Sequence, residues 1–306
     1  MKPSIGSTNV KLVAIVGVTA LGLVVSAGHI AAAPSSPPNN PAAIPQALSE
    51  TVLAPDADAA LVARDTRTSA ALGFPAGAQR IGRHVVDGFQ NSEYDEVTEL
   101  DSAGQVTSVT QFNSQGRLLS AVRLDIVAAS GDRVDQSAAA EVAQSSASAV
   151  GLVVGAPSSS EADQATGGWT FHWARTQAGV RVRGDETRVQ VWPDGRIQSV
   201  ARVEHDLAAA PTTPLSAQLA RQLASMNLNR WFAGKNSSYA IQGLDLEWAG
   251  PNAAFDPAMV DAAPTPYRLA WVVVVEPSGD AASAVSLMCL FVDAGDGTII
   301  GGDFVE

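Results

Sequence analysis

Residues 167–200 decide the fold, and they read GGWTFHWARTQAGVRVRGDETRVQVWPDGRIQSV. Trp169, Phe171 and Trp173 alternate with other side chains, and in an extended strand alternate side chains point to opposite faces. A second alternating run follows, and Asp194-Gly195 then interrupts it with a pair typical of tight turns, because glycine adopts the positive φ that such turns need. The stretch therefore predicts antiparallel strands in hairpins, with one aromatic face that packs against another layer.

The same type of turn recurs outside this stretch. From Tyr94 onward short alternating runs are separated by turns at 101–104 and 113–116, and the run 292–297 closes another hairpin near the end of the chain. Segments 112–125 and 192–206 are similar to each other, which predicts equivalent hairpins.

Two amphipathic helices are expected between the strands. Residues 135–151 are rich in Ala and Ser, and Asp135 or Ser137 could cap their N-terminus. A second helix is expected to begin at Thr213-Pro214, since proline is favoured in the first turn. Its apolar stripe must cover a sheet. The stripe consists of Leu215, Leu219, Leu223 and Met226.

The two halves of the chain follow the same order of elements. Runs 267–275 and 285–292 are apolar on both faces, which is typical of central strands covered by a helix on one side. Trp173 in the first half corresponds to Trp271 in the second. A diverged duplication of one α+β unit explains this order, and deleting either tryptophan is expected to endanger folding.

These segments resemble a known family. The run 167–200, followed by TPLSAQLARQL (213–223), resembles the PepSY and YcdB/YcdC group, which is related to the propeptide module of thermolysin- and fungalysin-type proteases. RLAWVVVVEPSG (268–279) and LFVDAGDGTIIGG (290–302) are similar to the closing strands of a second such unit, so the resemblance covers roughly residues 85–306. It implies an α+β fold of two cystatin-like (PepSY-like) units, each a helix packed on a curved antiparallel sheet. Unlike the protease precursors, these 306 residues include no peptidase after the modules.

The first residues resemble an export signal. Lys2 and Lys11 precede the uncharged run 12–28, which describes a secretory signal. The small pair Ala31 and Ala33 would place Pro34 directly after a cut, where a rigid tertiary amide fits a peptidase poorly. A cleaved signal peptide and a retained signal anchor therefore both remain open, and in either case the chain is expected to be exported.

The chain divides into four predicted segments. Five prolines follow the signal and favour an extended spacer, after which 57–72 could form a short helix. The segments are 1–33, signal peptide or signal anchor; 34–79, Pro/Ala-rich linker with a short helix; 80–208, first PepSY-like unit; and 209–306, second PepSY-like unit.

Charge and cysteine content limit the class of protein. The 306 residues carry a formal charge of −12 from 19 basic and 31 acidic side chains, which argues against nucleic acid or an anionic membrane surface as the partner. Membrane contact is expected only through the N-terminal segment. The single Cys289 excludes an intrachain disulfide framework and any multi-cysteine metal site.

No established catalytic, phosphate-binding or zinc motif occurs in the sequence, and no catalytic, cofactor-binding or metal-ligating residue is predicted. His172 lies in the aromatic strand and faces away from the aromatic side chains, so a structural role is preferred to that of a ligand or base. Cys289 stands between apolar neighbours and is expected to be a core residue and not a nucleophile.

Three polar motifs each allow two interpretations. The strand 93–101 places four carboxylates on one face, which indicates a solvated acidic face or a weak Ca²⁺ site. Asp293 to Gly297 is expected to be a hairpin turn, although it shares some features with a calcium loop. Arg183-Gly184-Asp185 matches an adhesion tripeptide, but the strand pattern already accounts for it. The four carboxylates are those of Glu93, Asp95, Glu99 and Asp101.

The resemblance implies an exported, non-catalytic binding or regulatory protein of the cell envelope. Its partner would be a separate extracytoplasmic protein, such as a peptidase. The alternative is an envelope sensor or small-ligand carrier that uses the concave face of the sheet, with a pocket lined by Trp169, Phe171 or Trp173. A hydrolase is a third interpretation and would need an acid pair that the sequence does not identify.

Overall fold

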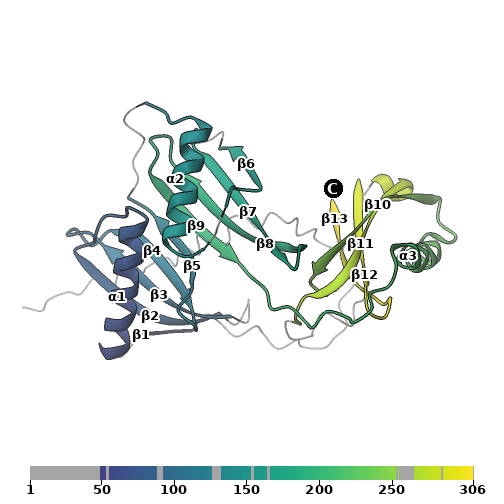
Figure 1. Cartoon of the computed structure of the whole chain (residues 1–306), viewed down its shortest axis with the longest axis horizontal. Helices are drawn as coiled ribbons and strands as arrows, with labels where there is room; N and C mark the ends of the chain where they lie inside the picture. Colours follow the sequence, from purple (N-terminus) through teal and green to yellow (C-terminus); the bar gives the residue numbers. More distant parts are fainter. Residues whose placement is uncertain are drawn as a thin grey trace, which may run out of the picture.

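The computed structural model describes residues 49–52, 55–87, 92–125, 132–152, 155–163, 166–252, 254, 265–283 and 285–305. It confirms a mixed α+β fold, in which three helices cover a sheet of 13 strands within the described residues (Figure 1). The helices are α1 (Pro55–Ala71), α2 (Gln136–Ala149) and α3 (Ala217–Phe232), with a short 3₁₀ turn, η2 (Asp280–Ser283). The strands are β1 (Ser49–Val52), β2 (Gln79–Asp87), β3 (Ser92–Leu100), β4 (Val106–Asn113), β5 (Leu118–Arg123), β6 (Ser159–Ala162), β7 (Trp169–Gln177), β8 (Val180–Val191), β9 (Ile197–Val203), β10 (Ser237–Ala249), β11 (Arg268–Gly279), β12 (Leu287–Asp293) and β13 (Ile299–Val305).

The main path of the sheet runs β1-β2-β3-β4-β5-β9-β8-β10-β11-β12-β13, and β7 pairs with both β6 and β8. The neighbouring strands β8 and β10 pair in parallel, through Val182 and Trp248, whereas the other pairs are antiparallel. The predicted turns are confirmed: Gly104, Gly116 and Gly195 adopt positive φ between paired strands. Local turn chemistry therefore sets the hairpins on either side of the α2 segment.

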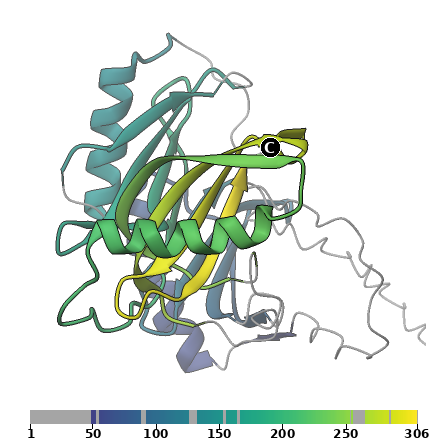
Figure 2. The same ribbon diagram turned by 90° about the vertical axis from the view of Figure 1, so that its right-hand side faces the viewer.

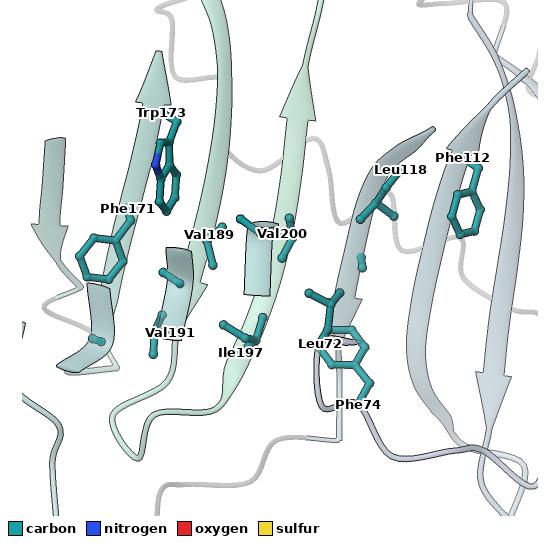
Figure 3. Packing of buried hydrophobic residues seen from close by; sticks show 14 of the residues in the cluster. Leu72, Phe74, Phe112, Leu118, Phe171, Trp173, Val189, Val191, Ile197 and Val200 are labelled. Atoms are coloured by element: carbon teal, nitrogen blue, oxygen red, sulfur yellow. The ribbon is translucent and has the colours of Figure 1, made fainter. Parts of the chain in front are cut away.

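One hydrophobic core lies beneath both α1 and α2. It joins Leu61 and Leu72 of the α1 region to Phe112 on β4, and it continues to Phe171 and Trp173 on β7 (Figure 3). The aromatic face that the alternation predicted is thus buried, and Phe171 is only 1% exposed. The two helices thus share one core with β3, β4, β5, β7, β8 and β9.

A second core lies between α3 and the strands β10–β13, and α3 crosses these strands (Figure 2). Val273 and Leu290 are fully buried beneath the helix. The opposite face of the same strands is also buried, around Val272 and Phe291. The prediction that the last long apolar strands lie inside the sheet and are covered by a helix on one side is confirmed.

The helices rest on the sheet through small side chains. The buried stripe of α2 is Ala139, Ala143 and Ala147, and that of α3 begins with Ala220 and Ala224 and ends with Leu228. The predicted stripe on the second helix is confirmed only in part. Leu223 packs against the second core, but the helix starts after Ser216, and Leu219 and Met226 are 40% and 53% exposed. Alanine lets a helix backbone lie close to the strands, so the larger side chains pack at the edges or face solvent.

The predicted N-termini of the helices are partly confirmed. The carboxylate of Asp135 accepts a hydrogen bond from the N–H of Ala138 and caps α2, as expected. For α3 the capping residue is Ser216 and not Thr213, because the Ser216 hydroxyl accepts from the N–H of Leu219. In both helices a short polar side chain satisfies one of the free backbone donors.

The arrangement of two equal cystatin-like units is not confirmed, since two helices cover the first core and one covers the second. The short helix expected at 57–72 exists as α1, and its Leu61 belongs to the first core. The strands β1 and β2 precede Tyr94, where strand structure was expected to begin. The boundaries proposed at 79/80 and 208/209 stay predictions.

The predicted signal segment 1–33 and most of the proline-rich spacer lie outside the described residues. Among the described helices, none has the length and apolar character needed to cross a membrane.

Candidate functional site

A cavity of about 650 Å³ opens on the helix-covered face of the sheet, and we call it the arginine cavity. Its walls come from α1, from the turn between β4 and β5, from the C-terminal end of α2 and from β9. Four arginines line it. This is a large share of the 19 basic residues of a chain whose net charge is −12. The four are Arg64, Arg67, Arg117 and Arg202.

The end of α2 forms one wall because the chain turns back sharply there. The N–H of Leu152 donates to the carbonyl of Ala147 at 2.9 Å, and the N–H of Gly151 donates to that of Ser148 at 3.0 Å. This pair of bonds defines a Schellman motif, which satisfies helix carbonyls and folds the next apolar residue against the helix. Leu152 is therefore brought to the cavity beside Val150.

Arg64 is held in place by two neighbours. Its guanidinium lies over the ring of Phe112, 5.4 Å from the centroid, in a cation–π contact. On the other side it lies against Gly116, where an added Cβ would be 2.6 Å from the guanidinium carbon. Gly116 serves both the positive φ of the hairpin turn and the close approach of this arginine.

Gly116→Ala is expected to destabilise the chain by about 1–3 kcal/mol, because the left-handed backbone is strained in alanine and the new methyl group displaces Arg64. Urea unfolding measures the change. Gly104→Ala is the matched control: it has the same backbone strain, with φ of +77°, but open space around the Cβ. Equal losses in the two variants would contradict the expected cost of displacing Arg64 from Gly116.

The four arginines differ in their partners. Glu204 lies 3.9 Å from the guanidinium of Arg117 and also pairs with Arg202. Within the described chain no carboxylate lies within ion-pair distance of Arg64 or Arg67. The α1 side of the cavity therefore carries positive charge that the described protein does not neutralise.

The chemistry of the lining suits recognition. A guanidinium stays protonated, donates hydrogen bonds in a planar fork and matches carboxylate or phosphate oxygens. The half-buried Val150 and Leu152 add apolar surface to the same cavity. The described lining residues include no carboxylate, imidazole or thiol, so they offer no general base.

Sequence reasoning did not identify this site. The available signal was the pair Arg64 and Arg67, three residues apart in a predicted helix, with no acidic residue three or four positions away. Arg117 and Arg202 lie far away in the sequence, and strand pairing between β5 and β9 brings their neighbourhood together.

His172 and Cys289 take structural positions. His172 Nδ1 lies 3.1 Å from a carboxylate oxygen of Glu186, and this hydrogen bond raises the pKa of His172. Cys289 is buried on β12, and burial raises the pKa of its thiol, which disfavours the nucleophilic thiolate.

Residues 93–101 form β3 and the start of the turn after it, and the structure corrects the interpretation as a solvated face at one of the four carboxylates, Glu99. Glu93 is exposed, and Asp95 and Asp101 are half-buried. Glu99 is fully buried beside Val97, and it accepts hydrogen bonds from Arg80 at 2.7 Å and from the N–H of Gly77 at 2.5 Å. Asp95 pairs with His84 at 2.9 Å. No cluster of three or more His, Cys, Asp or Glu side chains suited to a metal occurs among the described residues.

Asp65 on α1 and Glu99 on β3 form a buried carboxyl pair. Both residues are 0% exposed, and both contact Arg80. One oxygen of Asp65 lies 3.4 Å from the Nε of Arg80, which also binds Glu99. Burial is the main cause that raises the pKa of Asp65 to about 6, and the neighbouring Glu99 shifts it in the same direction. Among the described residues Arg80 is the one cation that contacts both carboxyl groups, so this pair carries more negative than positive charge when both are ionised.

The adhesion tripeptide is not presented as a free loop. Asp185 is 2% exposed, and its carboxylate binds Arg175 at 2.8 Å and His205 Nδ1 at 2.5 Å. Arg183 reaches strands β10 and β13, where it binds Glu247 at 3.1 Å and Asp303 at 2.7 Å. Both charged residues of the tripeptide are therefore engaged in ion pairs within the protein.

The segment Asp293 to Gly297 is a hairpin turn between β12 and β13, as expected. The pocket expected around the aromatic strand is replaced by packed core, because Phe171 and Trp173 are buried under α2. The arginine cavity lies at a different place on the same face of the sheet.

No family model matches the chain, and no curated protein matches it. Among solved structures it is similar to the Bacillus megaterium YpeB C-terminal domain. The match has 13% identity and a TM-score of 0.43, and it covers 83% of this chain and 99% of that domain. A similarity of this size assigns neither a family nor a function.

Proposed function

We propose that the protein is an exported, non-catalytic binding or regulatory protein of the cell envelope, which acts on a separate extracytoplasmic protein such as a peptidase. The arginine cavity is the observation that carries this proposal. Its described lining combines guanidinium groups with apolar side chains, and this chemistry binds an anionic group without transferring a proton to it.

The proposed relationship to PepSY-like modules rests on the sequence pattern of 167–223 and on helices that pack across antiparallel strands. In this proposal each core corresponds to one PepSY-like region, and α1 is an addition to the first. Export rests on the basic and apolar character of residues 1–33.

The second candidate is an envelope sensor or carrier of a small anionic ligand. The volume of the arginine cavity favours it, since about 650 Å³ lies within the range of small-molecule sites. The two candidates differ in the occupant of the cavity: a segment of another protein, or a free molecule.

Pull-down from a membrane fraction is expected to recover a specific protein with the wild-type chain and markedly less of it with Arg67→Glu. Arg67 is exposed and lies within ion-pair distance of no carboxylate among the described residues, so the fold is preserved while the positive charge of the cavity falls. Arg181→Glu, at an exposed position on β8 outside the cavity, is the matched control. Protease assays on the recovered protein then test whether it is a peptidase under regulation.

Failure to recover any specific protein with the wild-type chain would remove the regulatory proposal. Equal recovery with wild type and Arg67→Glu would leave a binding protein whose partner surface lies outside the arginine cavity.

A further inference from the structure

We propose that the arginine cavity binds an acidic peptide segment of the partner, in which carboxylates meet the arginines and an apolar side chain enters between them. This inference rests on the proposed function and names the class of ligand for its site.

The cavity has a charged rim and an apolar floor. Arg67 on α1 and Arg117 on the β4–β5 turn are exposed. The half-buried Val150 and Leu152 at the end of α2 supply the accessible apolar surface, above the buried Phe112 and Leu118. A peptide with acidic and apolar side chains interspersed matches both surfaces. Carboxylates fit guanidinium groups through paired N–H···O bonds, which are stronger than bonds between neutral groups.

The distribution of charge favours several carboxylates over one small anion. The guanidinium groups come from α1, from the β4–β5 turn and from β9, so they stand on separate walls of the cavity. Arg202 and Arg117 already share Glu204, while Arg64 and Arg67 have no carboxylate partner in the described chain. The positive charge that is not neutralised within the described chain therefore lies on the α1 side of the cavity, at Arg64 and Arg67.

The rest of the molecule limits where an acidic segment can bind. The net charge of −12 repels such a segment over most of the surface, and the arginine cavity concentrates the opposite charge in one concave place. Charge complementarity therefore selects both the ligand and the position at which it docks.

A phage-displayed library of random seven-residue peptides, selected on the full chain, tests this inference without a known partner. We expect the selected peptides to be enriched in Asp and Glu together with an apolar residue. Binding of the best peptide, measured by fluorescence anisotropy, should weaken about tenfold or more in Arg67→Glu and should also weaken as NaCl is raised. Arg181→Glu should bind the peptide as the wild type does.

Three results would overturn the inference. Selected peptides could lack an excess of acidic residues, the best peptide could bind Arg67→Glu as tightly as wild type, or inorganic phosphate alone could bind the cavity while no peptide is selected. The last result indicates a small anion as the ligand. Each of them is distinct from failure of the proposed function, which is decided by recovery of a partner in the pull-down.

Discussion

Replacing Trp173 with alanine is expected to lower the free energy of unfolding by about 3–5 kcal/mol, the usual range for truncation of a buried aromatic side chain. Trp173 is 7% exposed in the core beneath α2, and its indole N–H donates to the carbonyl of Gly155 at 3.1 Å. Alanine removes the packed ring and this hydrogen bond together. Such a loss is a large part of the stability of a typical domain.

Urea unfolding of the full chain measures the effect, and Trp173→Phe is the matched variant. Phenylalanine keeps an aromatic ring on β7 but cannot bind Gly155, so it should cost clearly less than alanine. If Trp173→Ala changed the stability by less than about 1 kcal/mol, as surface substitutions do, the ring would not be part of a packed core.

Local features of the fold could be predicted because the residues that determine them lie within a few positions of one another. In the turn that begins at Asp101, the carboxylate accepts from the N–H groups of Ala103 and Gln105, and Gly104 has φ of +77°. Alternation likewise placed Phe171 and Trp173 on one face. Neither prediction needed knowledge of the tertiary structure.

The buried sides of the helices could not be predicted from apolar size. In α3 the larger Leu219 and Met226 suggested the buried stripe, but Ala220 and Ala224 lie against the sheet. The distance between helix and strands decides which residues fit, and that distance is a property of the packed layers. The close approach of α3 to the strands is therefore a feature of the tertiary structure that the helix sequence alone does not indicate.

The polar sites depend on contacts between distant segments. The alternation put Glu99 on the same face as Val97, which was a signal that this face is buried, yet its partners Arg80 and Asp65 lie on other elements. β2 itself was missed, since its glycine and charged residues hide the alternation. The arginine cavity was missed for the same reason, because three elements contribute its charges.

The chain is expected to lose up to about 3 kcal/mol of stability through Asp65 as the pH rises from about 4 to about 7.5. Burial, and then Glu99, raises the pKa of Asp65 from 3.8 to about 6. Between these two values the folded chain keeps a proton on Asp65 that the unfolded chain has released. The stabilisation is therefore complete below about pH 4 and is lost as the pH rises through 6.

Asp65→Asn isolates this effect, because its amide stays neutral at every pH. Urea unfolding at about pH 4, 6 and 7.5 should show that the variant gains on the wild type as the pH rises. Asp132→Asn, at an exposed position, should follow the wild-type curve. If Asp65→Asn and the wild type instead kept a constant difference across this range, Asp65 would be ionised throughout it in the folded chain, and burial beside Glu99 would not raise its pKa.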